Sequence, residues 1–207
     1  LMDRLAPRFR VFAPDAYGAG KSPQWPSDRE LSLHDEAALL EPVFERVGAP
    51  LALVGHSYGA AVALIAALRQ PARIRALVLY EPTLFALLDA QAPPPNPADG
   101  IRAAAAQSVA ALERGDADAA AEHFIDYWMG RGAWAQMPPA RQAPIAASIV
   151  DVRRWAHALL NEPTPLAAFR TLDLPVLCLV GRRSTASAHG VTQLLVTALP
   201  QVERLAF

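Results

Sequence analysis

Residues 51–61 read LALVGHSYGAA, and this stretch decides the fold of the chain. Its first four residues follow Pro50 as a short apolar run, which is typical of a strand buried on both faces in a parallel sheet. The alanine-rich segment from Tyr58 to Arg69 then predicts a helix. Between the strand and the helix, residues 55–59 read GHSYG and match the pattern G-x-S-x-G. That pattern indicates a nucleophilic serine when it joins a buried strand to a helix, which is its context here.

Ser57 is therefore the candidate nucleophile. Such a turn is strained and lifts the serine hydroxyl above the sheet edge. It also brings the strand and helix backbones together, so the residues two before and two after the serine must be small, and Gly55 and Gly59 meet this requirement. The helix directs free N–H groups at the reacting centre, and the backbone N–H of Tyr58 is a candidate oxyanion donor. The alternative is a passive serine in a glycine-flanked turn. His56 is expected to point away from Ser57 and to have a structural role.

The rest of the chain alternates short apolar runs with helical patterns. Further strands are expected at Arg10–Pro14, Ile74–Tyr80, Val176–Val180 and Val202–Phe207. Further helices are expected at residues 1–6, at Leu31–Val47 with a kink or break at Pro42 and a cap at Gly48, and at Gly190–Leu199. This alternation predicts an α/β fold with a mostly parallel sheet flanked by helices.

Residues 83–165 interrupt this alternation. They open with a proline-rich segment, Pro93–Pro97, and continue with helical patterns at residues 101–114, 117–129 and 140–161. We interpret them as a helical cap inserted between two parts of the core, residues 1–82 and residues 166–207.

Composition and charge narrow the range of partners. The chain has 207 residues, of which 53% are hydrophobic and 19% charged, so we expect a folded globular protein. A net charge of −1 provides no basic field for nucleic acid, and no apolar run reaches the roughly 18 residues that span a membrane. No signal peptide is visible, which favours the cytoplasm, and Cys178 is expected to be a buried apolar side chain. With nucleic acid and membrane excluded, the expected partner is a small-molecule substrate.

With these features the chain resembles the α/β-hydrolase superfamily over essentially all of its length. Residues 15–22, with the pattern D-x-x-G-x-G-x-S, resemble the loop after the fourth strand of that fold, and residues 55–59 resemble its nucleophile elbow. Residues 80–82 resemble the end of its sixth strand, where the cap begins. Residues 175–181 and 202–207 resemble its seventh and eighth strands.

The sequence also departs from the family pattern at three places. No His-Gly loop, the source of the second oxyanion donor, precedes Leu1, and the sequence stops at Phe207, where the loop with the catalytic histidine should begin. We therefore expect a chain that is truncated at both ends. The usual acid follows the seventh strand, but Ser184 stands at that position and cannot act as a carboxylate.

Glu81 is the best candidate for the acid that orients the base. It ends a core strand, where active-site groups of open parallel sheets gather, and some members of the superfamily place their acid there. The alternative role for Glu81 is to order the turn at the cap hinge. Asp15 is expected to form a turn, and Asp173 precedes its strand at the wrong end of the sheet. None of the histidines lies in the expected loop, and no cluster has metal-ligand spacing: His34, His56, His123, His157 and His189.

Aromatic residues recur in the cap segment. Phe124, Tyr127 and Trp128 share one helix face, and Trp134 and Trp155 follow them. They are expected to pack the cap, to form an apolar pocket wall above Ser57, or to do both.

Together the residues and the resemblance imply a serine-dependent hydrolase that needs no cofactor and acts on a small, largely apolar ester or a related acyl or C–C substrate. Ser57 attacks, a histidine outside this chain acts as base, and Glu81 orients it. A serine nucleophile argues against dehalogenase or epoxide hydrolase chemistry. The alternatives are acyl transfer at the same site, a non-catalytic ligand-binding member of the fold, and an inactive fragment. The 207-residue chain alone is expected to be inactive.

Overall fold

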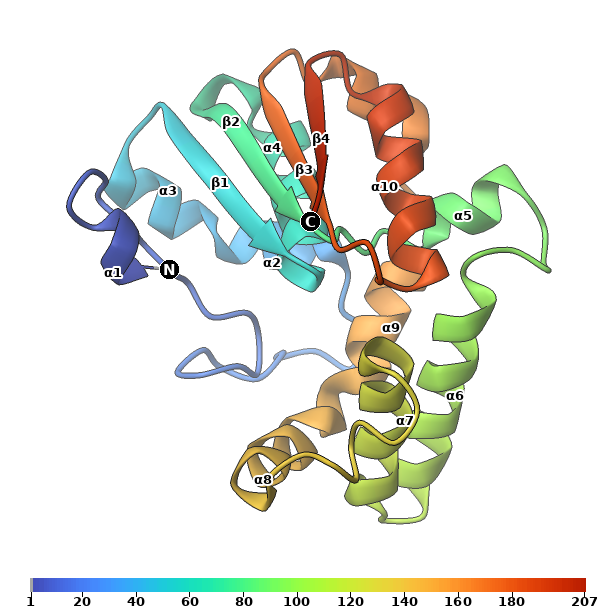
Figure 1. Cartoon of the computed structure of the whole chain (residues 1–207). Helices are drawn as coiled ribbons and strands as arrows, with labels where there is room; N and C mark the ends of the chain where they lie inside the picture. Colours follow the sequence, from blue (N-terminus) through green and yellow to red (C-terminus); the bar gives the residue numbers. More distant parts are fainter. Residues whose placement is uncertain (1) are drawn as a thin grey trace.

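The computed structural model describes residues 2–207 and contains one parallel sheet with the strand order β1-β2-β3-β4. Its strands are β1 (Leu51–His56), β2 (Ile74–Tyr80), β3 (Val176–Val180) and β4 (Val202–Ala206), which confirms four of the five predicted strands to within two residues (Figure 1). All three neighbouring pairs are parallel. Leu1, the first residue of the predicted opening helix, lies outside the described residues.

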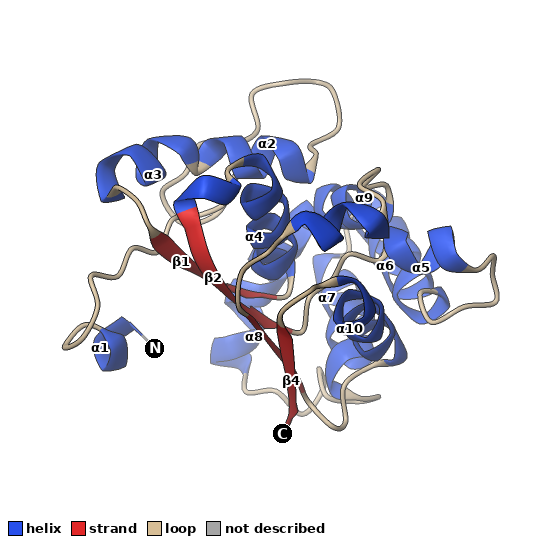
Figure 2. Ribbon diagram, turned by 90° about the horizontal axis from the view of Figure 1, so that it is seen from above, coloured by secondary structure: helices blue, strands red, loops and turns tan. Residues whose placement is uncertain are grey.

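Helices cover one face of this sheet, as the view from above shows (Figure 2). Two of the three connections between neighbouring strands lie on this face (Figure 2): α4 (Tyr58–Arg69), followed by a 3-10 turn at Pro71–Arg73, joins β1 to β2, and α10 (Ala186–Ala198) joins β3 to β4. Before β1 the chain forms α1 (Met2–Leu5), α2 (Leu33–Leu39) and α3 (Glu41–Val47). The predicted helix at Leu31–Val47 therefore breaks just before Pro42, because proline lacks the N–H that the helix interior needs.

Within residues 2–207 the opposite face of the sheet is largely exposed. Ala52, Val54 and His56 point to this side of β1, and Val54 is 56% exposed. The prediction that this strand is buried on both faces was wrong, because right-handed connections between strands in this order place α4 and α10 on the same face.

The predicted strand at Arg10–Pro14 is absent, and this segment is mostly exposed and forms no regular structure. A strand is stable only when its N–H and C=O groups pair with a neighbour. Within residues 2–207 the edge strand β1 pairs with β2 alone. The apolar spacing of this segment was therefore not sufficient to predict a strand.

Between β2 and β3 the chain forms a group of helices beyond the carboxyl ends of the strands (Figure 1). They are α5 (Ala86–Gln91), α6 (Asp99–Glu113), α7 (Ala117–Met129), α8 (Pro139–Ser148), a 3-10 turn (Ile149–Asp151) and α9 (Val152–Leu160). A 3-10 segment (Leu166–Thr171) leads back to β3. The sequence did not predict α5. Trp134, Met137 and Ile149 belong to a hydrophobic cluster of these helices that is separate from the main core.

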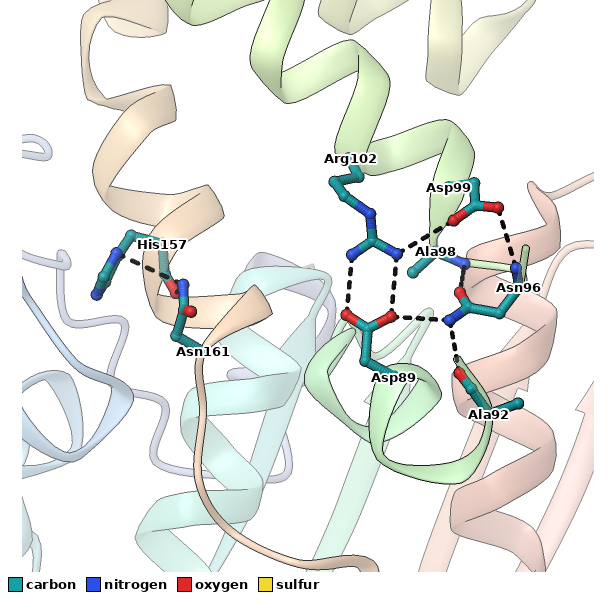
Figure 3. Close-up of polar contacts among 8 residues, drawn as sticks. All are labelled: Asp89, Ala92, Asn96, Ala98, Asp99, Arg102, His157 and Asn161. Carbon is teal, nitrogen blue, oxygen red and sulfur yellow. Dashed lines mark hydrogen bonds and ion pairs between the residues drawn. The ribbon is translucent and has the colours of Figure 1, made fainter. Parts of the chain in front are cut away.

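A polar cluster fixes the corner between α5 and α6 (Figure 3). Arg102 donates two hydrogen bonds to Asp89, at 2.8 and 2.9 Å. Asn96, in the proline-rich segment, donates to Asp89 Oδ1 at 2.8 Å and to the carbonyl of Ala92 at 2.9 Å. These bonds satisfy the backbone where prolines prevent regular structure, so the segment is a defined turn.

Candidate active site

The turn from β1 into α4 holds Ser57 in a strained conformation. Its φ is 52° and its ψ is −119°, a region that residues other than glycine rarely adopt. The N–H of Ser57 donates to the carbonyl of Tyr80 at 2.9 Å, so the turn is tied to the end of β2. A Cβ at Gly55 would lie 2.4 Å from the carbonyl oxygen of Gly59, and only glycine permits this approach. A Cβ at Gly59 would meet nothing within 4 Å, so the steric reason predicted for that glycine is absent from the described residues.

Within residues 2–207 the N–H groups of Tyr58 and Gly59, the first two of α4, have no hydrogen-bond acceptor, whereas those of Ala60 and Ala61 donate to the carbonyl of Ser57. Tyr58 is the first residue of the helix, and an N–H in that position has no partner within its own helix. Ser57 precedes the helix without a side-chain capping bond, so its hydroxyl is not used to satisfy those groups. The nucleophile candidate and the oxyanion donor candidate therefore lie side by side with their polar groups available.

Glu81 occupies the corresponding turn at the end of β2. Its φ is 48°, and it and Ser57 are the non-glycine residues with positive φ in the described part of the chain. Its carboxylate oxygen Oε1 accepts hydrogen bonds from the N–H of Gly181, at 3.1 Å, and from the hydroxyl of Ser184. Within residues 2–207 no hydrogen bond reaches Oε2, which is therefore free to accept one from another group.

Ser184 thus has a role that the sequence analysis missed. It stands where the resemblance places the usual acid, and its hydroxyl donates to the carboxylate of Glu81, one strand away. The sequence offered a hint of this contact, because a glutamate ends one predicted strand and a serine stands where the usual acid would follow the next. The contact could not be derived, because the two residues are 103 positions apart.

Glu36 is a second residue that the sequence analysis missed. It lies on α2, is only 2% exposed, and accepts hydrogen bonds from the N–H of Tyr17 and from the hydroxyl of Tyr58, both at 3.2 Å. Burial raises the pKa of its carboxyl, and burial together with the charge of Glu36 raises the pKa of the Tyr58 phenol. A signal was present in the sequence, because Glu36 shares the apolar face of its helix with Leu33 and Ala37.

The histidine side chains of residues 2–207 make their polar and stacking contacts elsewhere than at Ser57 and Glu81. The imidazole of His56 points to the open face of the sheet and stacks on Tyr80, with 4.5 Å between the ring centroids. In the described part of the chain no histidine nitrogen forms a hydrogen bond or ion pair with Ser57 or Glu81. The other histidines lie in α2 (His34, 3.3 Å from Glu162), in α7 (His123), in α9 (His157, beside Asn161 in Figure 3) and in α10 (His189).

The remaining candidates have structural contacts. Asp15 accepts a hydrogen bond from the N–H of Lys21 at 3.0 Å and so forms a turn within its own loop. Asp173 accepts one from Gln201 at 2.6 Å, at the amino end of the strands. Cys178 is buried, as predicted, and burial raises the pKa of its thiol to about 11.

The aromatic residues of α7 pack at the junction between the inserted helices and the core. Phe124, Tyr127 and Trp128 all lie against the main hydrophobic cluster. The ring of Trp128 is 6.4 Å from that of Phe85, measured between centroids. The hydroxyl of Tyr127 is within 2.6 Å of the hydroxyl of Ser187 at the start of α10. The packing role predicted for these residues is therefore present.

Two further properties concern metals and membranes. In residues 2–207 no three or more His, Cys, Asp or Glu side chains are grouped so that they could hold a metal ion. In the same range, every helix is too short or too polar to span a membrane.

Sequence comparison identifies the family. A family model of the alpha/beta hydrolase fold matches residues 1–207. The chain therefore belongs to the α/β-hydrolase family. It is also 32% identical over 148 residues to lipase LipV of Mycobacterium tuberculosis, in a match that covers 65% of this chain and 55% of that lipase. The chain thus spans little more than half the length of this curated relative.

Solved structures share the fold over nearly the whole chain. An alpha/beta hydrolase from Sphaerobacter thermophilus is 25% identical, has a TM-score of 0.70, and is matched over 99% of this chain and 77% of its own. A thermophilic esterase from Thermogutta terrifontis is 21% identical, has a TM-score of 0.71, and is matched over 100% of this chain and 74% of its own. The second likeness concerns the fold alone. Each solved structure is longer than the part that this chain matches.

Proposed function

We propose that this chain carries the nucleophile and the acid of a serine-dependent ester hydrolase. The observation that carries the proposal is the pair of strained residues, Ser57 and Glu81, at the ends of two neighbouring parallel strands. Strain of this kind costs on the order of 1–3 kcal/mol per residue and is concentrated at functional sites. In parallel sheets the active-site groups gather at the carboxyl ends of the strands, which is where both residues lie.

Each residue has one task in this mechanism. A base removes the proton from the Ser57 hydroxyl, which attacks the ester carbonyl and forms a tetrahedral intermediate. The backbone N–H of Tyr58 donates to the oxyanion of that intermediate. The free oxygen Oε2 of Glu81 accepts a hydrogen bond from the base, a histidine that residues 2–207 do not supply, and fixes its tautomer. No cofactor takes part in these steps.

We propose a small, largely apolar acyl ester as substrate and residues 83–165 as the cap that binds it. Two observations support this choice. The relatives include proteins named as a lipase and as an esterase. In addition, the inserted helices bring aromatic side chains, Phe124 and Trp128 among them, to the junction with the core. An apolar wall of this kind binds acyl chains and excludes water from the site.

The direct test is covalent labelling of the nucleophile. The protein is expressed from its whole open reading frame (hereafter the full-length protein), treated with a fluorophosphonate probe, and digested for mass spectrometry. We expect one modified peptide, with the label on Ser57, and no label in Ser57→Ala. Ser22→Ala, in an exposed loop, is the matched control and should be labelled normally. A label on any other serine would overturn the proposal.

We further propose that residues 1–207 alone do not turn over esters. Within the described part of the chain no histidine nitrogen forms a hydrogen bond with Ser57 or Glu81, which supports this proposal, and loss of the base costs a serine hydrolase about 10⁶ in turnover. The purified chain should hydrolyse p-nitrophenyl butyrate no faster than its Ser57→Ala variant. Clear Ser57-dependent turnover would refute this and identify a base among the histidines of the chain.

A further inference from the structure

The buried carboxylate of Glu36 connects three segments near the candidate site. Glu36 and Glu162 are the buried carboxylic acids of residues 2–207, and Glu36 is the one that contacts the elbow. One of its oxygens accepts a hydrogen bond from the backbone N–H of Tyr17, in the loop before α2. The other accepts from the hydroxyl of Tyr58, the residue that directly follows Ser57. Both bonds join segments about twenty residues apart in sequence, with separations of 19 and 22 residues.

The hydrogen bond to Glu36 anchors the elbow through a side chain, in addition to the backbone bond from Ser57 to Tyr80. Ser57 has a strained backbone, and α4 begins without a side-chain capping bond. The Tyr58 phenol is the side chain of the first helical residue, and its hydrogen bond to Glu36 fixes the direction in which this residue leaves the turn. The backbone N–H of the same residue must aim at the oxyanion. The ring and the N–H share one Cα, so anchoring the ring restricts the orientation of the N–H.

Stability alone gives no reason for a glutamate at this position. A buried carboxylate carries a desolvation cost that a leucine or alanine on the same helix face would avoid. The neighbours of Glu36 on that face, Leu33 and Ala37, are buried apolar residues. Buried polar groups of this kind specify one arrangement of the chain, and here the arrangement that they specify is the elbow.

We propose that Glu36 is a positioning residue for the hydrolysis, which acts through the Tyr58 phenol to hold the Tyr58 N–H in line with the oxyanion. This inference rests on the proposed function, since it assumes that Ser57 is the nucleophile. Glu36 touches neither substrate nor nucleophile. Its removal should therefore lower kcat, where the oxyanion develops, and leave KM nearly unchanged.

The test compares Glu36→Gln, Tyr58→Phe and the double variant in the full-length protein. Complete loss of one oxyanion donor costs about 10²–10³ in kcat, so a misaligned donor should cost about 10–50-fold. We expect this loss in each single variant, with KM changed less than about twofold. The double variant should be no worse than the poorer single variant, because both remove the same hydrogen bond. Active sites are counted by fluorophosphonate titration, so that kcat refers to folded enzyme.

The matched control is Glu41→Gln. Glu41 also faces α4, where it pairs with Arg69 at 2.7 Å, but this ion pair is solvent-exposed and distant from the elbow. Its kcat should equal that of the unsubstituted protein. If Glu36→Gln fails to fold, Tyr58→Phe decides alone, because it removes only one hydroxyl.

The outcomes separate this inference from the proposed function. If Ser57 is labelled but kcat is within twofold of normal in both single variants, the positioning role is wrong and the nucleophile stands. If KM rises while kcat is unchanged, Glu36 affects substrate binding instead and the inference is also wrong. If the unsubstituted protein is not labelled at Ser57, both proposals are overturned.

Discussion

The turns after β1 and β2 share one backbone feature but are held by different contacts. Each places a non-glycine residue with positive φ, Ser57 or Glu81, at the carboxyl edge of the sheet. The first turn is held by steric contact, since Gly55 allows the start of α4 to lie directly against the strand. The second is held by hydrogen bonds from Gly181 and Ser184, at the end of β3.

The two turns therefore differ in how far along the sequence the residues that hold them lie. The steric contact that shapes the Ser57 turn lies within a few consecutive residues, Gly55 to Ala60, and distant bonds to Tyr80 and, through Tyr58, to Glu36 add to it. The Glu81 turn depends on residues 100 and 103 positions away, so its geometry should be sensitive to the position of β3. Substitutions at the two turns should therefore differ in the property that they change as well as in the size of the effect.

The largest effect is expected at the first turn. Ser57→Ala removes the proposed nucleophile and should lower kcat for p-nitrophenyl butyrate by about 10⁶ in the full-length protein. The fold should be unchanged, because the Ser57 side chain makes no capping bond. Circular dichroism and initial rates measure the two effects. A residual rate above about 1% would mean that another group attacks the ester.

A smaller effect is expected from the support of the second turn. Ser184→Ala removes a hydroxyl that donates to Glu81 and leaves the carboxylate with the N–H of Gly181 as its protein donor. The carboxylate then loses orientation, and we expect kcat to fall about 10–100-fold with little change in KM. Ser148→Ala, which removes a hydrogen bond from a serine hydroxyl to the carbonyl of Ile145 on the exposed surface of α8, is the control and should be neutral. An unchanged kcat in Ser184→Ala would show that β3 does not control the second turn.

The two glycines of the elbow should give the clearest contrast in stability. Gly55→Ala places a methyl group 2.4 Å from the Gly59 carbonyl and should lower the free energy of unfolding by more than about 2 kcal/mol. Gly59→Ala meets nothing within 4 Å and replaces a helical glycine, so it should raise that free energy by up to about 1 kcal/mol. Urea denaturation of the 207-residue chain measures both. Equal losses in the two variants would contradict the steric account of the first turn.

The same contrast explains what the sequence could predict. The strand, turn and helix around Ser57 were predicted at their correct positions because periodicity, glycine and alanine all act within a few residues. The open face of the sheet and the unpaired segment at Arg10–Pro14 were predicted wrongly, because both depend on what lies beside a strand. The hydrogen bond from Ser184 and the buried position of Glu36 are likewise tertiary contacts. For Glu36 the sequence did contain a signal, because a glutamate on an apolar helix face is unusual.

The role of Glu81 can also be tested by moving the carboxylate. In the Glu81→Gln background, Ser184→Asp places an acid at the position that the family resemblance gives for it. We expect this double variant to recover at least tenfold over Glu81→Gln alone. Ser184→Asn in the same background is the matched control and should recover nothing, because an amide does not carry the charge that stabilises the protonated base.

The most direct test of the central claim is the turnover of Glu81→Gln in the full-length protein. Loss of the orienting acid of a triad lowers kcat by about 10⁴ while leaving the geometry largely intact, and we predict a loss of this size with an unchanged circular dichroism spectrum. The label on Ser57 should still form, but slowly. A loss of less than tenfold would contradict the claim that Glu81 and Ser57 act in one catalytic unit.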